Sequence, residues 1–246
     1  MSSHHLWFPS RREFFVTMGA AAGVALSGLR LDAQSRPMRI GIIGSGRQGG
    51  AIGLQWAKAG HQILFSSRNP DNLKGLVAKA GPNARAGTPA EAAKFGEVVL
   101  IAVPYGELPN VGRDHGALLQ GTIVIDCGNP RADRDGPMAK EALAKGTGIA
   151  SAEYLPGARL VRAFNALSFV QVEREAHRAG EKLGIPIAGD DKAAVATVAR
   201  LVQDAGFDPV IVGGLARARE FDAGTPVYVK GLTARQFREA LKLPNP

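Results

Sequence analysis

The chain has 246 residues, a formal net charge of +8, a single cysteine and 6% aromatic residues. One cysteine cannot form an intramolecular disulfide, and the scattered lysines and arginines lack the interleaved aromatic residues typical of single-stranded nucleic-acid surfaces. These properties exclude a disulfide-stabilised domain, indicate no nucleic-acid partner, and fit one α/β domain with a small appendage.

Residues 1–34 are expected to form a signal peptide. The segment 10–16, Ser-Arg-Arg-Glu-Phe-Phe-Val, resembles the twin-arginine export motif, and a mild apolar stretch at 18–29 follows it. That stretch is shorter than the about 20 residues that span a bilayer. We therefore expect export to the periplasm by the twin-arginine pathway, cleavage near Ala33 or Gln34, and no stable membrane span after processing. An ordinary N-terminal amphipathic helix and an uncleaved anchor are the alternatives.

Residues 35–246 are expected to form an α/β domain of the Rossmann type, with a doubly wound, mainly parallel sheet and a small C-terminal helical extension. Apolar runs of strand length alternate with helical patterns, which is typical of a sheet covered on both faces. The predicted strands are 39–44, 62–66, 84–86, 97–103, 122–126, 159–164, 185–189 and 209–212. Helix starts are predicted at Thr88, at Asp190-Asp191 and at Thr233, with a short helix over 215–221.

The first predicted strand ends in a glycine-rich turn with the spacing G-x-G-x-x-G, formed by Gly44, Gly46 and Gly49. The first glycine permits a sharp turn, the second lets backbone N–H groups approach a pyrophosphate, and the third lets the helix pack close to the strand. Unpaired N–H groups and the helix dipole favour anions at this place. The turn therefore predicts a dinucleotide-binding βαβ unit, whereas a bare tight turn is the alternative.

The end of the second predicted strand indicates which dinucleotide binds. An NAD site usually carries Asp or Glu there, which accepts hydrogen bonds from the ribose 2′-hydroxyl. This chain has Ser67 followed by Arg68. A guanidinium can pair bidentately with a 2′-phosphate, which a carboxylate would repel. NADP(H) is therefore the predicted cofactor.

Further strand ends should meet the glycine turn at the same edge of the sheet. Pro104 should turn the chain across the cofactor, and Cys127 should be a small buried thiol. His61, His115 and His177 have no metal-ligand spacing, so no metal is predicted. His61 is expected to be structural. No arrangement of acid, base and nucleophile is visible, which suits hydride transfer between two cofactor-like rings.

The order of the motifs resembles one group of oxidoreductases. The glycine turn is followed by Ser67-Arg68-Asn69-Pro70, Val103-Pro104-Tyr105, Arg162-Ala163-Phe164-Asn165 and Gly189-Asp190-Asp191. In these motifs the chain resembles the NADPH:deazaflavin (coenzyme F-420) oxidoreductase family and the oxidoreductase domain of the STEAP metalloreductases. The resemblance covers about residues 38–225. One departure is that Phe164-Asn165 stands where the deazaflavin enzymes carry a histidine.

The resemblance implies hydride transfer between NADPH and a deazaflavin, FAD or FMN. It implies three groups of contacts: Ser45, Gly46, Arg47 and Gln48 with the phosphates, Ser67, Arg68 and Asn69 with the 2′-phosphate, and Val103, Pro104 and Tyr105 with the nicotinamide. Asn129, Ala163 and Asn165 should border the ring of the flavin or deazaflavin, which is the second ring beside the nicotinamide. Asn165 and Tyr105 are the expected catalytic-site residues. A small-molecule electron acceptor and a homodimer are the expected partners.

Two other functions are left open by the sequence. The chain could be an imine or carbonyl reductase of the pyrroline-5-carboxylate reductase type, although only about 30 residues follow the last predicted strand, too few for the long helical region of that enzyme. It could also be an NADP(H)-binding sensor or partner module of an exported redox system.

Overall fold

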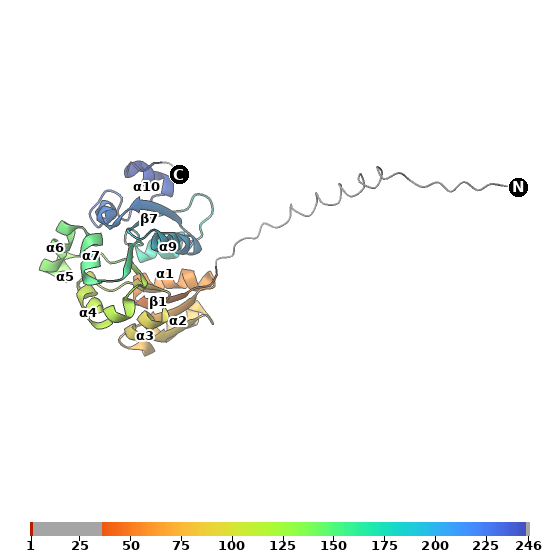
Figure 1. Ribbon diagram of the computed structural model, residues 1–246, viewed down its shortest axis with the longest axis horizontal. Coiled ribbons are helices and arrows are strands. Elements are labelled where there is room, and N and C mark those ends of the chain that lie inside the picture. The colour runs from red at the N-terminus through yellow and green to blue at the C-terminus, as the bar shows by residue number, and fades with distance from the viewer. Residues whose placement is uncertain (2–35, 245–246) are drawn as a thin grey trace. The chain divides into compact units, whose positions relative to one another are not determined.

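The computed structural model describes Met1 and residues 36–244. The predicted signal peptide and its cleavage site lie outside the described residues. Eight strands form one sheet: β1 (Arg39–Ile43), β2 (Gln62–Ser66), β3 (Ala84–Gly87), β4 (Val98–Ile101), β5 (Ile123–Asp126), β6 (Arg159–Arg162), β7 (Gly184–Gly189) and β8 (Asp208–Gly213). Their order is β3-β2-β1-β4-β5-β6-β7-β8, so the connection from β3 to β4 passes both β2 and β1. Figure 1 shows β1 and β7 of this sheet with helices around them. This is the predicted doubly wound Rossmann-type α/β fold.

Helices connect the strands. The first half contains α1 (Arg47–Lys58), η1 (Pro70–Leu73), α2 (Lys74–Ala80), α3 (Pro89–Phe95), η2 (Tyr105–Glu107) and α4 (Leu108–Leu119). The second half contains α5 (Ala132–Asp135), α6 (Pro137–Lys145), α7 (Thr147–Tyr154), α8 (Phe169–Glu175), α9 (Lys192–Asp204), η3 (Leu215–Phe221) and α10 (Ala234–Ala240). The three short helices between β5 and β6 were not predicted.

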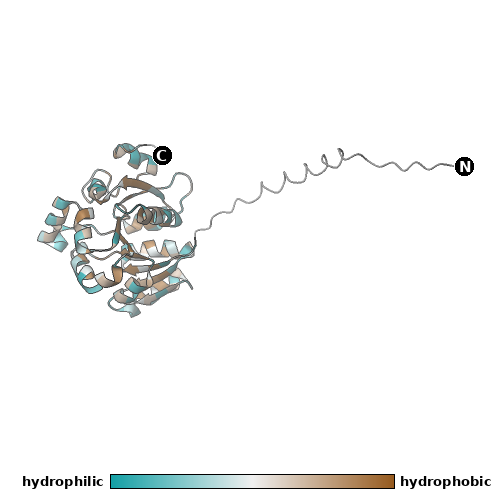
Figure 2. Cartoon of the chain, viewed as in Figure 1, coloured by the Kyte–Doolittle hydropathy of each residue, from teal (hydrophilic) through white to brown (hydrophobic). Residues whose placement is uncertain are grey.

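The strands are buried because helices cover both faces of the sheet. Alternate residues of β4 point to opposite faces, so Val98 and Leu100 join a core with α1 and α9, while Val99 and Ile101 join a core with α3 and α4. Figure 2 shows the hydrophobic strands inside and the hydrophilic residues on the outer helices. Near-continuous apolar strands are what a parallel sheet with two covered faces requires.

The last two strands, β7 and β8, run against the first six. β7 pairs antiparallel with β6, and β8 is parallel to β7, whereas the other neighbouring strands are parallel. The carboxyl ends of β7 and β8 therefore lie at the edge opposite the carboxyl ends of β1 to β6. The sheet is mainly parallel, as predicted.

Capping residues fix several helix starts as the sequence predicted. Thr88 and Thr233 form capping boxes with the residues three positions on, and Asp191 accepts hydrogen bonds from Ala193 N–H at 2.9 Å and Ala194 N–H at 3.0 Å. The neighbouring Asp190 does not cap α9 but accepts a hydrogen bond from Leu215 N–H at 2.9 Å. It therefore ties the end of β7 to the start of η3.

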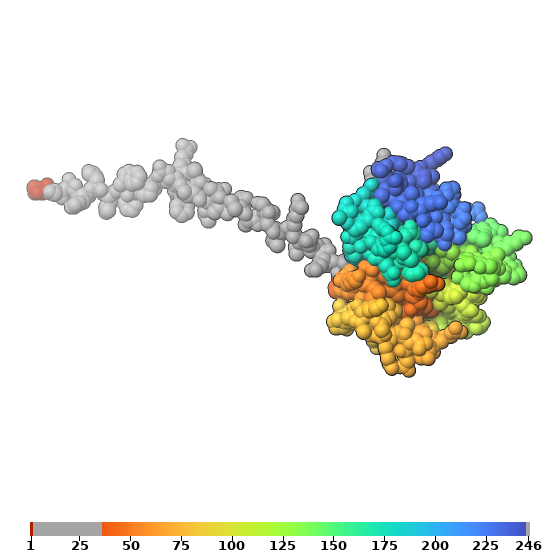
Figure 3. Space-filling view, turned by 180° about the vertical axis from the view of Figure 1, so that it is seen from behind, coloured from red at the N-terminus to blue at the C-terminus, as the bar shows by residue number. Residues whose placement is uncertain are grey.

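The C-terminal extension packs onto the far end of the sheet. Residues 37–244 belong to one compact unit. A third apolar cluster joins β8, η3 and α10, with Phe221 and Phe237 at its centre, and α10 lies near β7 in Figure 1. Figure 3 shows this later part of the chain, in cyan and blue, on one side of the surface and the first strands and helices, in orange and yellow, on the other. Among residues 36–244, no helix combines the length and the apolar character needed to span a membrane.

Candidate functional site

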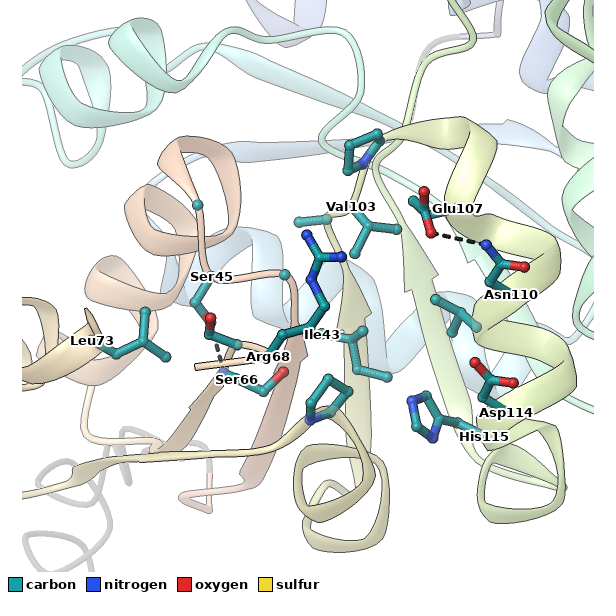
Figure 4. A pocket seen from close by; sticks show the side chains of 17 residues that line it. Ile43, Ser45, Ser66, Arg68, Leu73, Val103, Glu107, Asn110, Asp114 and His115 are labelled. Atoms are coloured by element: carbon teal, nitrogen blue, oxygen red, sulfur yellow. Dashed lines mark hydrogen bonds between the residues drawn. The ribbon is translucent and has the colours of Figure 1, made fainter. Parts of the chain in front are cut away.

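A cleft of about 510 Å³ opens where the carboxyl ends of β1, β2 and β4 meet (Figure 4). The glycine turn and the end of β2 form one side, and the segment after β4 together with α4 forms the other. Such a crevice beside the point where the strand order reverses is where open α/β sheets bind ligands. Of the residues predicted to bind the cofactor, the cleft contains Gly44, Ser45, Gly46, Ser67, Arg68, Val103 and Pro104.

The glycine turn leaves space for an anion at the start of α1. Gly44 has φ +95°, and a Cβ atom there would lie 2.7 Å from the Ala102 carbonyl oxygen, so this position requires glycine. A Cβ atom at Gly46 would meet no atom within 4 Å, and a Cβ atom at Gly49 would collide with the Gly44 carbonyl oxygen. Gly46 is the N-cap of α1, and no side chain accepts from the first N–H groups of the helix. These donors are therefore available to a pyrophosphate.

Two serines join the glycine turn to the end of β2. Ser45 Oγ accepts a hydrogen bond from Ser66 N–H at 2.8 Å, and Ser66 Oγ donates to the Ile42 carbonyl oxygen at 2.7 Å. The Ser45 side chain thus holds the strand, in addition to lining the cleft. These bonds hold the glycine turn against the end of β2, two residues before Arg68.

Arg68 is exposed and lies between Ser45 and Val103 in Figure 4. It forms no ion pair with any residue of the described chain. Ser67 Oγ accepts from Asn69 N–H at 3.1 Å, so Asn69 shapes the loop, but it does not line the cleft. Arg68, a cation with no ion-pair partner among the described residues, lies beside an uncapped helix start. This arrangement suits a ligand that carries phosphate at two separate places.

The opposite wall of the cleft was missed by sequence reasoning. It consists of side chains from η2 and the first two turns of α4: Glu107, Asn110, Val111, Asp114 and His115. Glu107 accepts a hydrogen bond from Asn110 Nδ2 at 3.0 Å. Their spacing of three or four residues after a strand end is the signal that could have identified them, because such residues share one face of a helix.

Two residues predicted to contact the phosphates have side chains directed elsewhere. The Arg47 guanidinium lies over the Phe169 ring, 4.9 Å from its centroid. Gln48 Nε2 donates to the Phe164 carbonyl oxygen at 3.1 Å and to the Leu167 carbonyl oxygen at 3.2 Å. Neither side chain lines the cleft, so only their backbone N–H groups are placed for an anion.

Tyr105 does not line the cleft, contrary to the sequence-based expectation. Its side chain is fully buried, and its hydroxyl bonds with Ser151 Oγ at 2.9 Å and donates to the Thr147 carbonyl oxygen at 3.3 Å. Burial raises the pKa of this phenol. The reason is local, since the chain after Pro104 turns at once into η2, which directs the ring into the core. Tyr105 is therefore a structural residue rather than part of the catalytic site.

The predicted second-ring residues form a separate group. Asn129 Nδ2 donates to the Asn165 carbonyl oxygen at 2.8 Å, and Asn165 Nδ2 donates to Asn129 Oδ1 at 3.3 Å and to the Phe221 carbonyl oxygen at 3.4 Å. Asn165 is 2% exposed, and its Oδ1 atom has no hydrogen-bond partner in the described structure. Ala163 is buried beside them. The structure brings these residues together at the ends of β5 and β6, outside the lining of the cleft.

A buried ionic network supports this second group. Arg162 donates to Asp126 Oδ2 at 2.6 Å and to the Gly128 carbonyl oxygen at 2.8 Å. Its second carboxylate partner is Asp222, with Oδ1 at 3.4 Å. Both Arg162 and Asp126 are fully buried. This network could not be predicted from the sequence, because its members lie far apart in the chain, in β5, in β6 and after η3.

Two other titratable residues that the sequence singled out, His61 and Cys127, lie in the core. His61 Nδ1 accepts from Met38 N–H at 3.1 Å, and His61 Nε2 faces Asp204 Oδ2 at 3.1 Å, with burial lowering the pKa of the imidazole. Cys127 is buried, and burial raises the pKa of its thiol to about 12. Within residues 36–244, no three His, Cys, Asp or Glu side chains are grouped as a metal site.

Comparison with known proteins finds a family model and a curated relative. Residues 39–130 match the model of the family described as NADP oxidoreductase coenzyme F420-dependent. The chain is 31% identical over 195 residues to metalloreductase STEAP3 of Rattus norvegicus, covering 75% of this chain and 36% of that protein. The chain thus spans 36% of the length of this curated relative.

Solved structures share the fold over most of the chain. A hypothetical protein of Sinorhizobium meliloti has a TM-score of 0.67 and 25% identity, covering 80% of this chain and 95% of its own. A candidate F420-dependent NADP reductase of Arthrobacter has a TM-score of 0.66 and 23% identity, covering 85% and 96%. The resemblance predicted from the motifs is confirmed, with the match to the NADP oxidoreductase family model lying in residues 39–130.

Proposed function

We propose that this NADP-binding oxidoreductase domain transfers hydride from NADPH to a flavin or a deazaflavin. The observation that carries the proposal is the single cleft joining the uncapped start of α1 to the unpaired Arg68. These two features lie where the pyrophosphate and the 2′-phosphate of NADPH would be held. NADPH, when bound, supplies the hydride that reduces the acceptor and becomes NADP⁺.

The cleft suits the adenosine half of the nucleotide. If the pyrophosphate were held at Gly46 and the 2′-phosphate at Arg68, Val111, Asp114 and His115 of α4 would border the adenosine half. Val103 and Pro104 would border the nicotinamide half. The chain's contribution would be to orient the two halves.

The group around Asn129 and Asn165 favours a ring acceptor over a carbonyl or imine. With Tyr105 buried, this group offers amides and apolar atoms but no acid to protonate a substrate during reduction. A flavin or deazaflavin needs hydrogen bonds and a flat apolar neighbour rather than a general acid. Reduction of an imine and a sensor role without turnover are the outcomes that would replace this proposal.

The test follows NADPH oxidation by the purified protein against FMN, FAD, deazaflavin, quinones and ferric chelates, with pyrroline-5-carboxylate and simple ketones as contrasting substrates. We expect a flavin or deazaflavin to be reduced and the imine and ketones to be inert. Faster reduction of an imine or ketone than of any flavin would overturn the mechanism. Binding of NADPH with no turnover of any acceptor would favour the sensor.

We also propose that the protein is exported by the twin-arginine pathway. The support is the Arg11-Arg12 pair before a mild apolar stretch. Substituting both with lysine keeps the charge but removes the paired guanidinium groups, so precursor with an intact N-terminus should accumulate in the cytoplasm. Fractionation followed by immunoblotting measures this, and equal periplasmic amounts of variant and parent would contradict it.

A further inference from the structure

The side chain of Gln48 links the phosphate-binding end of α1 to the turn formed by residues 164–169. Gln48 lies in the first turn of α1, two residues after Gly46. Its Nε2 atom donates to the carbonyl oxygens of both Phe164, at 3.1 Å, and Leu167, at 3.2 Å. One amide group thus satisfies two acceptors of the same turn, more than 100 residues away in the sequence.

The backbone conformation of this turn is unfavourable by itself and needs stabilising contacts. Phe164 has φ +63°, a left-handed conformation that is uncommon and unfavourable for a bulky residue. Its ring is fully buried and packs edge-on against Trp56, with centroids 5.7 Å apart. Trp56 belongs to α1 as well, so the helix holds the turn through a hydrogen-bonding side chain at its start and an aromatic side chain further on.

The turn carries Asn165, which is the centre of the second-ring group. The Asn165 carbonyl oxygen accepts from Asn129 at 2.8 Å, and its side chain is 2% exposed with an unpartnered Oδ1 atom. Any rotation at Phe164 would move this atom, because Asn165 is the next residue. Gln48 therefore acts on the Asn129–Asn165 pair through the backbone of the turn.

We propose that Gln48 is a positioning residue that couples the nucleotide-binding end of α1 to the acceptor-facing Asn129–Asn165 pair. The inference rests on the proposed function for the identity of the second ring. It assigns the Gln48 side chain to the turn of residues 164–169 rather than to a phosphate. A phosphate contact would require the amide to leave both carbonyl oxygens unpaired in a partly buried place.

The first experiment does not depend on activity. Gln48→Met keeps the length of the side chain and removes its N–H donors, so amide hydrogen exchange of peptides covering residues 163–168 should be at least about tenfold faster in the nucleotide-free protein. Gln120→Met is the matched control, because Gln120 Nε2 also donates to a carbonyl oxygen, that of Pro156 at 2.8 Å, but at an exposed place outside the cleft. Unchanged exchange at 163–168 in Gln48→Met would overturn the inference.

The second experiment separates positioning from phosphate binding. In Gln48→Met, the Kd for NADPH should stay within about threefold of the parent, while acceptor reduction at saturating NADPH should fall at least tenfold. Gln48→Lys retains a donor of similar length and should restore both slow exchange and acceptor reduction. Equal losses of NADPH affinity and turnover in Gln48→Met would overturn the inference, and so would failure of the lysine variant to restore slow exchange. If exchange responds as expected but the parent reduces no flavin, the proposed function fails and the role of Gln48 in holding the turn stands.

Discussion

At the scale of single residues, nucleotide preference depends on Arg68. Its guanidinium is exposed at the end of β2 and has no internal partner in the described structure. Arg68→Ala should weaken NADPH binding by roughly ten- to a hundredfold, the effect of losing one charge-assisted pair, and should leave NADH binding nearly unchanged. Calorimetric titration of both nucleotides measures the difference. Equal losses for the two nucleotides would mean that Arg68 does not contact the 2′-phosphate.

A second residue-scale prediction concerns His61. Its Nδ1 atom accepts from Met38 N–H, so the folded protein holds the neutral imidazole, and burial lowers its pKa below the ordinary 6.5. A base with a lowered folded-state pKa gives stability that is present above the unfolded pKa and is lost as the pH falls toward the folded value. The free energy of unfolding should therefore decrease below about pH 6.5, by at most about 1.4 kcal/mol per pH unit.

The measurement is denaturant unfolding of the parent and His61→Gln between pH 7.5 and 5.5. The variant should lose the His61 part of this dependence, while His115→Gln, on the wall of the cleft, should retain it. A parent and a His61→Gln variant with the same pH dependence would show that the pKa of His61 is not lowered in the folded protein.

The positions of individual side chains could be predicted where the geometry of a strand end or a helix start determines them. Gly44, Gly46 and Arg68 occupy the predicted cleft because strand ends and helix starts restrict what can stand there. Tyr105 was placed wrongly because the direction of a side chain after a proline depends on the following turn, here η2. The buried pair of Arg162 and Asp126 could not be foreseen, because charged residues normally indicate the surface.

At the scale of elements, the turn between β1 and α1 contains glycines with two different roles. Gly44 is needed for the backbone conformation, and Gly46 leaves space for a ligand. Gly46→Val places a side chain in open space, so the fold should persist, but the side chain would occupy the place of the pyrophosphate and abolish binding of both NADPH and NADH. Gly44→Val instead puts a branched residue at φ +95° against the Ala102 carbonyl and should lower stability itself. Thermal unfolding and nucleotide titration of the two variants distinguish these effects. An unchanged NADPH Kd in Gly46→Val would make the motif only a turn.

Elements with strong local signals were predicted correctly. Strands and helix starts followed from apolar runs and from caps such as Thr88 and Asp191. The antiparallel direction of β7 and the three short helices between β5 and β6 were not predicted, because direction depends on how long connections cross the sheet. The predicted strand over 159–164 ends instead at Arg162, where the chain leaves the sheet before the left-handed residue Phe164.

At the scale of the whole molecule, the buried network around Arg162 joins the nucleotide domain to its C-terminal extension. Arg162 pairs with Asp126 of β5 and with Asp222, which follows η3 and bonds Thr147 Oγ1 at 2.5 Å. Arg162→Met would leave two buried carboxylates without their cation, and should destabilise the protein by about 3–5 kcal/mol. Arg131→Met, which removes an exposed pair with Asp133, should leave the free energy of unfolding nearly unchanged.

Equilibrium unfolding in denaturant measures both variants. A loss in Arg162→Met no larger than that in Arg131→Met would show that the network contributes little, and that the apolar cluster of β8, η3 and α10 alone holds the extension in place.

The reversal of β7 also affects how proteins with this fold can diverge. Because β7 and β8 end at the edge opposite the cleft, the residues that immediately follow them do not line it. Insertions or deletions at these two places would change a surface outside the lining of the cleft. Substitutions that affect cofactor binding and substitutions that affect that surface would then fall at different positions, so selection could act on the two independently. Homologues should accordingly vary most in length after β7 and β8 and least between β1 and β2.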